Sequence, residues 1–296
     1  MTSVSLPTPP TFDDALVEKC RAGRDFRPML FDWYKYVATL SLTVGSILPD
    51  SPGVRRIPSI HFGTLVGLLN RCFRLMMSNV ALIADGHFVE ATQVLDRCVI
   101  ESALKIQWLC LPESKARFSR FLADGLSRDL KLKDHIQQSM RERGGRPLVI
   151  ERRMVESIQG CLGAAGLSEG QVRGAARLPT LDLICVDLKL PEGFYIAVQG
   201  MGSHPVHGTW TDLIRNYLIE RDGVFKLRYE GVTTHHNQYV IVSRMVVRSI
   251  RTFLSHITDP EDVKGYHEAA AMADREIASL DQADQGNDFE IAPGEE

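Results

Sequence analysis

The sequence lacks the short motifs that mark the common catalytic folds. It has 23 glycines, yet no glycine-rich loop has the spacing of a dinucleotide-binding turn or a P-loop. Neither GxSxG nor HExxH occurs, which leaves α/β-hydrolase and zincin activities without support. The six cysteines, at positions 20, 72, 98, 110, 161 and 185, form no CxxC pair and no clustered Cys/His spacing. We therefore expect buried thiols, no metal site and no cofactor.

Long apolar runs and a strong net charge are missing as well. The apolar stretch at residues 65–83 is interrupted by polar residues and does not reach the roughly 20 continuous apolar residues of a membrane span. Residues 1–14 contain neither a basic leader nor an apolar run, so we expect no secretory signal. The formal net charge of −3 argues against a broadly basic surface and leaves room only for a local basic groove. We expect a cytoplasmic protein without a membrane partner.

The spacing of apolar residues predicts an all-α protein. Two long helices are expected over residues 61–84 and 87–110, and the short link at Asp85-Gly86 predicts that they form an antiparallel hairpin. The predicted fold is an irregular multi-helix bundle around this central hairpin, with at most a small β element near residues 224–233. Further helices are expected over residues 12–22, 29–48, 112–141 and 237–257, and from Pro260 onward.

Composition predicts a simple domain organisation. We expect a flexible segment at residues 1–11, a single helical domain at 12–278 and an acidic, disordered tail at 279–296. Residues 147–179 predict one helix followed by a loose stretch rich in glycine, alanine and arginine. For two short segments, residues 181–188 and 194–199, the pattern fits either helix or strand.

A first polar island lies in the second helix of the predicted hairpin. Arg97 and Glu101 are four residues apart, so they lie one helical turn from each other and can pair. Apolar residues surround them on both sides of the helix, which indicates that the pair packs inside the protein. Such a pair is either a structural ion pair that sets the helix register or part of a functional site.

A second polar island contains Ser203, His204 and His207. Pro205 is typical of a first helical turn, so we expect a helix to begin there with Ser203 as its N-cap. His207 would then share an apolar face with Trp210. A histidine in that setting is either an acid–base group that works near neutral pH or a structural core residue.

The predicted helix at residues 237–257 carries a basic stripe. Arg244, Arg248 and Arg251 follow one another at spacings of four and three. This stripe fits a phosphate-binding surface, and it fits equally the solvated face of an amphipathic helix, which we favour. The neighbouring histidines, His235, His236 and His256, show no metal-ligand spacing.

The two islands carry a family resemblance. The sequence resembles the bacterial proteins grouped as domain of unknown function 5677, over roughly residues 60–255. That family's pattern has an Arg followed four residues later by a Glu, and then a Ser and a His four apart that lead into a His-Gly-x-Trp-x-Asp-Leu-like stretch. The positions that match here are Arg97, Glu101, Ser203, His207, Gly208, Trp210, Asp212 and Leu213.

A more remote similarity is to the all-helical HEPN group, in which an Arg and a His cooperate in metal-independent RNA cleavage, often in toxins and phage defence. These enzymes place the two residues four to six positions apart on one helix. Arg228 and His235 have six residues between them, but Gly231 and β-branched residues in that stretch predict a turn. We take this match as chance, so an HEPN-like site would combine residues of two helices.

Three functional hypotheses follow. In an endoribonuclease, His207 would be the acid or base, Arg97 would stabilise a developing anion and Glu101 would orient them. In a non-catalytic binding protein, the same residues would form a buried polar network. In a sensor, Trp108 and Trp210 would line a ligand pocket. Candidate binding residues are Ser203, His204, Trp210, Asp212 and Trp108, and the expected partners are RNA or a protein, with a homodimer as a further expectation.

Overall fold

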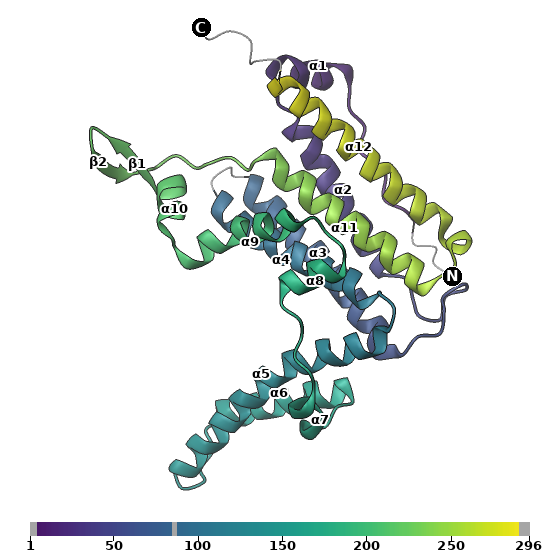
Figure 1. The fold of residues 1–296 in the computed structure, drawn as a ribbon, viewed down its shortest axis with the longest axis vertical. Helices are drawn as coiled ribbons and strands as arrows, with labels where there is room; N and C mark the ends of the chain where they lie inside the picture. The colour runs from purple at the N-terminus through teal and green to yellow at the C-terminus, as the bar shows by residue number, and fades with distance from the viewer. Residues whose placement is uncertain (1–4, 85–87, 290–296) are drawn as a thin grey trace. The chain divides into compact units, whose positions relative to one another are not determined.

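Helices make up most of the described chain. The computed structural model describes residues 5–84 and 88–289. Within them, the only strands form one small antiparallel hairpin (Figure 1), so the all-α prediction is confirmed. Three expectations fall partly or wholly outside the described residues: the turn at Asp85-Gly86, residues 1–4 of the flexible segment and residues 290–296 of the tail.

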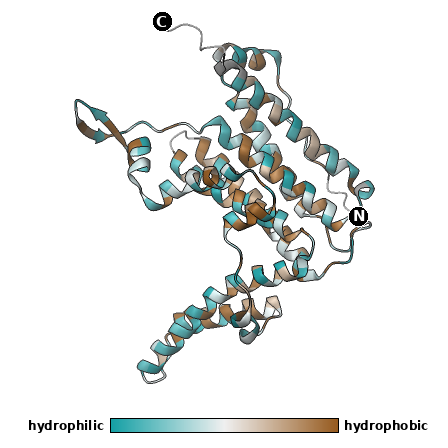
Figure 2. Ribbon diagram, viewed as in Figure 1, coloured by the Kyte–Doolittle hydropathy of each residue, from teal (hydrophilic) through white to brown (hydrophobic). Residues whose placement is uncertain are grey.

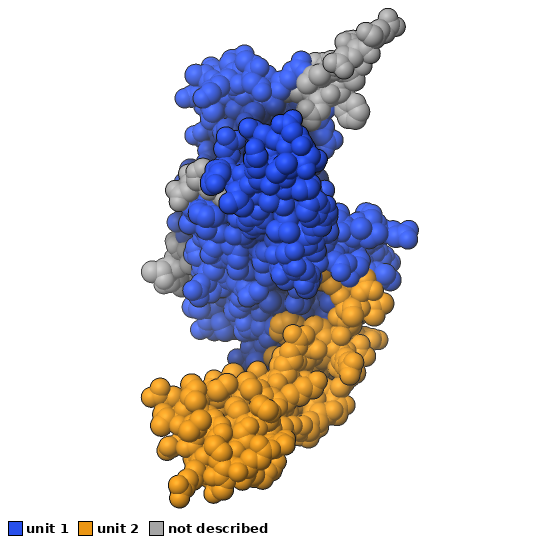
Figure 3. Space-filling view, turned by 90° about the vertical axis from the view of Figure 1, so that its left-hand side faces the viewer, with its two compact units in different colours: residues 1–110, 184–296 blue, residues 111–183 orange. Residues whose placement is uncertain are grey.

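The chain divides into two compact units, which Figure 3 distinguishes by colour. Unit 1 comprises Met1–Cys110 and Ile184–Glu296, and unit 2 comprises Leu111–Leu183. The sequence analysis placed no boundary within residues 12–278. The elements of unit 1 are α1 (Asp14–Gly23), α2 (Arg27–Gly45), α3 (Ser59–Ala84), α4 (Val89–Leu109), α9 (Glu192–His207), α10 (Trp210–Asp212), η1 (Leu213–Tyr217), β1 (Leu218–Arg221), β2 (Val224–Leu227), α11 (His236–Ile257), η2 (Pro260–Val263) and α12 (Lys264–Phe289).

The centre of unit 1 is a bundle of α2, α3, α4 and α11. Cys72 of α3 lies against Val99 of α4, and Asn79 lies against Asp96. Because the two helices meet in reverse order, α3 and α4 form the predicted antiparallel hairpin. The long helices carry both apolar and polar residues (Figure 2), and their apolar sides are buried in the bundle. Fully buried examples from the four helices are Val37, Leu69, Leu104 and Ile250.

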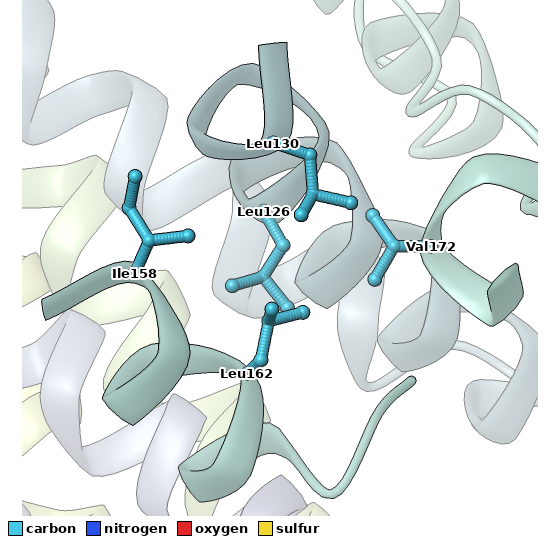
Figure 4. Close-up of a cluster of buried hydrophobic side chains, with 5 residues drawn as sticks. All are labelled: Leu126, Leu130, Ile158, Leu162 and Val172. Atoms are coloured by element: carbon cyan, nitrogen blue, oxygen red, sulfur yellow. The ribbon is translucent and has the colours of Figure 1, made fainter. Parts of the chain in front are cut away.

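Unit 2 is a smaller helical assembly. It contains α5 (Ser114–Glu142), α6 (Val149–Ala165) and α7 (Glu169–Gly174), and α8 (Leu181–Asp187) begins in it and ends in unit 1. A cluster of five buried side chains from α5, α6 and α7 holds it together (Figure 4): Leu126, Leu130, Ile158, Leu162 and Val172. Two ion pairs fasten α7 to α5, since Lys133 binds Glu169 and both oxygens of Asp134 accept from Arg173.

The region around Pro205 differs from expectation. No helix begins at Pro205, because α9 starts at Glu192 and Pro205 lies in its last turn. Pro205 has no N–H to donate to the carbonyl of the preceding turn, and α9 ends at Gly208, whose φ of 55° is left-handed. Ser203 is therefore inside α9 rather than at its N-cap. The segment 194–199, which fitted helix or strand, is part of the same helix.

Two further segments refine the expected map. β1 and β2 pair antiparallel with Leu218 opposite Leu227, which places the small β element at residues 218–227. Helix α12 continues to Phe289, so it includes the start of the segment for which we expected disorder. Leu280 is buried there, and Asp284 pairs with His236 at 3.1 Å, so tertiary contacts hold this acidic stretch in a helix.

One described helix has the length and apolar composition of a membrane span. This segment, Ser59–Ile83, makes up nearly all of α3. Leu65, Leu69, Cys72 and Met76 of this helix are fully buried in the bundle, whereas only 22% of its most apolar window is buried in all.

Candidate functional site

Arg97 and Glu101 form the ion pair that their spacing predicts. The Nε of Arg97 lies 3.1 Å from an oxygen of Glu101, and Lys105 approaches the other oxygen at 3.7 Å. The side chains of Arg97 and Glu101 are 26% and 30% exposed, so the pair is partly solvated rather than fully buried. Helix α9 rests on Arg97 at Gly202, where an added Cβ would lie 2.7 Å from the Cβ of Arg97. Glycine at 202 thus permits close packing of α9 on α4.

His207 and Ser203 belong to the last turns of α9. His207 is the last residue of α9 and is exposed, and Ser203 is half-buried in the preceding turn. Trp210 belongs to the next helix, α10, which begins after the Thr209 N-cap. His207 and Trp210 therefore do not share the helix face that the sequence predicted. The catalytic roles of Arg97, Glu101 and His207 stay predictions.

His204 and Asp212 line one cavity of about 380 Å³. The Nδ1 of His204 lies 2.8 Å from the hydroxyl of Thr209, while Asp212 is buried and accepts a hydrogen bond of 2.8 Å from the side chain of Asn216. Helices α4, α9 and α10, the π-helix η1 and the start of α11 enclose this His204 pocket. Its remaining charged or titratable lining residues are Arg215 and His235.

The two tryptophans do not form a common pocket. Trp108 is buried, and its indole N–H donates to Asp187 at 2.7 Å. Trp210 is exposed and meets Phe225 of β2 edge to face, with ring centroids 5.2 Å apart. Neither tryptophan lines a described cavity. The expected sensor pocket between them is therefore not formed, because one ring packs in the core and the other packs on the β-hairpin.

A buried carboxylate lies next to Arg97 in the sequence. Asp96 is 2% exposed and accepts hydrogen bonds from Tyr34 of α2, Asn79 of α3 and Gln238 of α11. Burial among these neutral partners raises the pKa of Asp96 to about 7, although their hydrogen bonds oppose the rise. Gln238 also lines the His204 pocket, so one side chain links that pocket to the centre of the bundle.

The largest described cavity is a groove of about 1080 Å³ along α11. Its lining follows one face of α11 from Asn237 to His256 and includes residues of α12 and of the segment 190–194. Four arginines face two aspartates in this α11 groove: Arg55, Arg244, Arg248 and Arg251 against Asp274 and Asp281. The groove is thus locally basic in a chain of net negative charge.

Counter-charges hold two of these arginines in place. Arg244 pairs with Asp274 at 3.0 Å, and Arg55 pairs with Asp259 and donates to the carbonyl of Ser255 at 2.9 Å. Arg248 and Arg251 have no ion-pair partner among the residues that the structure describes, and both are exposed. These two guanidinium groups are therefore available to an anionic ligand.

Two histidines line the same groove. Burial lowers the pKa of His256, and the electrostatic interactions with Arg55 and with nearby His61 lower it further. Burial and Arg251 likewise lower the pKa of His267. The Nε2 of His267 is buried and has no hydrogen-bond partner among the described residues. Both imidazoles are therefore uncharged at neutral pH in the free protein, as a general base requires.

One family comparison identifies the chain. The family of unknown function DUF5677 matches residues 62–225, which is more than half of the sequence. The chain belongs to DUF5677. No curated protein and no solved structure matches it.

The residues matched to the DUF5677 family include one of the two candidate sites and leave out most of the other. Residues 62–225 include α4, α9 and α10, and with them Arg97, Glu101, His204, His207 and Asp212. The α11 groove is built mainly from residues beyond 225, so the match ends before it. The resemblance stated for residues 60–255 is therefore confirmed over a shorter range.

Sequence reasoning missed one signal in the DUF5677 chain. Arg251 and His256 are separated by four residues on one helix, which is the spacing given above for the HEPN nucleases. The basic stripe groups Arg251 with Arg244 and Arg248 and leaves His256 outside it. Spacing alone could have paired them, but their cavity depends on α12 and on the segment 190–194, which pack against α11 only in the folded chain.

Proposed function

We propose that this DUF5677 protein is a metal-independent endoribonuclease that acts in the α11 groove. The observation that carries the proposal is the combination of Arg251, His256 and His267 in the largest described cavity, beside further arginines. An RNA phosphodiester supplies the negative charge that this wall attracts. Arg251 and His256 also have the spacing of the HEPN enzymes, to which we infer a functional likeness.

The proposed reaction is transesterification. Neutral His256 takes the proton of a ribose 2′-hydroxyl, whose oxygen attacks the adjacent phosphorus atom. Arg251 stabilises the extra negative charge of the pentacoordinate phosphorane. The bond to the 5′-oxygen breaks, and protonated His267 gives that oxygen its proton. The bound phosphate raises the pKa of His267, because an opposite charge favours the protonated imidazole. The products are a 2′,3′-cyclic phosphate and a free 5′-hydroxyl.

Purified protein tests this reaction directly. We expect cleavage of a single-stranded RNA in the presence of a metal chelator and no cleavage of the matching 2′-deoxy strand. His256→Ala should lower the rate about 10²- to 10⁴-fold, as loss of an acid–base group does, with an unchanged melting temperature. His207→Ala is the matched control, since His207 is exposed and outside the groove.

The two variants discriminate between the candidate sites. Loss of cleavage in His207→Ala with full activity in His256→Ala would move the reaction to Arg97, Glu101 and His207. In a toxin or phage-defence setting, expression of the wild type should arrest bacterial growth and degrade RNA, and His256→Ala should relieve both effects. Intact RNA and normal growth with the wild type would contradict the proposal.

The His204 pocket supports a second candidate, a ligand-binding protein without catalysis. Its volume suits a small molecule, and Gln238 joins it to the buried Asp96, so a ligand there would contact a residue of the core network. In this case a ligand would raise the melting temperature of the wild type, and His204→Ala would remove the rise. His256→Ala would leave it unchanged.

A further inference from the structure

We propose that the closed end of the α5–α6 hairpin, residues 141–153, docks on an anionic lipid bilayer. This hairpin end, called the 141–153 tip below, lies in unit 2 and does not include any residue of the α11 groove or the His204 pocket. It is a peripheral contact that needs no membrane-spanning helix, and it departs from the expectation, drawn from the absence of a long apolar run, that the protein has no membrane partner.

The tip exposes three consecutive aliphatic residues. Leu148, Val149 and Ile150 are 52%, 59% and 59% exposed, although residues of this kind are normally buried. The buried cluster of unit 2 ends at Ile158 on α6, so these three side chains contribute nothing to it. A contiguous apolar group at a hairpin end is the kind of feature that inserts into the boundary between lipid head groups and acyl chains.

Specific contacts fix the backbone turn that exposes Leu148, Val149 and Ile150. A Glu151 oxygen accepts the backbone N–H of Leu148 at 2.8 Å, and the guanidinium of Arg143 binds the same carboxylate. These two contacts lower the pKa of Glu151, so it stays ionised and keeps the first turn of α6 in place. Gly144 and Gly145, both at positive φ, let the chain reverse between the helices. The tip is therefore a built turn that presents its apolar residues outward.

Charge favours a lipid surface as the occupant. Five arginines surround the triplet in sequence, against only two glutamates, in a chain whose net charge is −3. Arg141, Arg146, Arg152 and Arg153 are exposed and have no ion-pair partner among the described residues. Each arginine near an anionic bilayer contributes about a fivefold gain in partitioning. Long arginine side chains also reach lipid phosphates while neighbouring aliphatic groups insert.

The shape of the tip also favours a lipid bilayer as its partner. No described cavity includes a residue of the tip, so the tip is an outward feature without a pocket. A fluid bilayer accommodates such a feature without a preformed groove, whereas a protein partner would have to supply one.

Sedimentation of the full-length protein with vesicles tests the proposal. We expect binding to vesicles of phosphatidylcholine mixed with phosphatidylglycerol and at least tenfold weaker binding to phosphatidylcholine alone, with a loss at high salt. Replacing the triplet by serine and, separately, Arg152 and Arg153 by glutamate should each lower binding at least tenfold. Arg128→Glu is the control, since Arg128 is exposed on α5 outside the tip. Circular dichroism checks that each variant stays folded.

Three results would overturn the proposal. The protein would bind neither kind of vesicle, or would bind both equally, or the tip variants would bind as well as Arg128→Glu. Loss of RNA affinity in the tip variants, without vesicle binding by the wild type, would assign the tip to nucleic acid instead. Because the tip lies outside the α11 groove, His256→Ala should bind vesicles normally, which separates this result from the outcome of the ribonuclease test.

Discussion

Asp96 and Arg97 are neighbours on α4, yet their surroundings differ in kind. Asp96 is enclosed by α2, α3 and α11 and bonds only to neutral side chains. Arg97 pairs with Glu101 on its own helix, and about a quarter of its side chain is exposed. Ionisation of the buried Asp96 carries a desolvation cost, whereas the charge of Arg97 stays partly hydrated and carries little of that cost. The contribution of a polar residue to stability therefore depends on the helices that surround it more than on its charge.

The largest expected difference between the two positions is in the pH dependence of stability. The pKa of Asp96 is about 7 in the folded protein, above its usual value of 3.8, so the folded state keeps a proton that the unfolded chain releases. This stabilising contribution is complete below pH 4, decreases as the pH rises, and is lost above pH 7. The loss amounts to about 4 kcal/mol. Denaturant unfolding at pH 5 and pH 8 measures the part of this loss that falls between those two pH values, about 2.5 kcal/mol.

Asp96→Asn is the control for this prediction, because an amide does not titrate. The difference in unfolding free energy between variant and wild type isolates the contribution of Asp96 from that of all other titratable groups. A variant that keeps the full pH dependence of the wild type would falsify the assignment.

Removing the Asp96 side chain should have the next largest effect. Asp96→Ala leaves Tyr34, Asn79 and Gln238 without their shared acceptor, and buried unpaired donors are costly. At pH 5, where the wild-type carboxyl is protonated, we expect a loss of about 3 kcal/mol in unfolding free energy. A loss below about 1 kcal/mol would mean that the network does not stabilise the bundle. Tyr34→Phe removes one of these hydrogen bonds and should cost less.

The smallest effect is expected at Arg97. Arg97→Gln keeps much of the aliphatic stem on which Gly202 rests and removes only the partly solvated ion pair. The unfolding free energy should fall by less than about 1 kcal/mol. Thermal unfolding beside Asp96→Ala gives the comparison. A loss as large as that of Asp96→Ala would show that the two regions are equivalent, and that Arg97 belongs to the structural network of the core.

The sequence predicted local features well where they depend on neighbours along the chain. The Arg97–Glu101 pair follows from one helical turn, and the α3–α4 hairpin follows from apolar periodicity and a short link. Pro205 shows the limit of such rules. Proline fits a first turn by preference, but residues 192–204 already form a helix packed on α4 at Gly202, so the proline falls in a last turn.

The candidate sites required contacts between distant segments. Asp96 did not stand out in the sequence because its three partners come from other helices, up to 142 positions away. The α11 groove was visible only as a stripe of arginines, since its opposite wall comes from α12 and from residues 190–194. The sequence becomes more polar after Pro112, at the first boundary of unit 2, but a polar helix also fits a single domain, so this change did not predict a second unit.

For this DUF5677 protein, the sequence by itself determined the helical class, most helix positions and the family, because periodicity, capping residues and short motifs act over a few turns. Only the tertiary structure decided which polar residues are buried, which of them share a cavity and where the chain divides into units. The physical reason is that burial, desolvation and cavity shape arise from side chains that meet across long sequence separations, and no local pattern records those meetings.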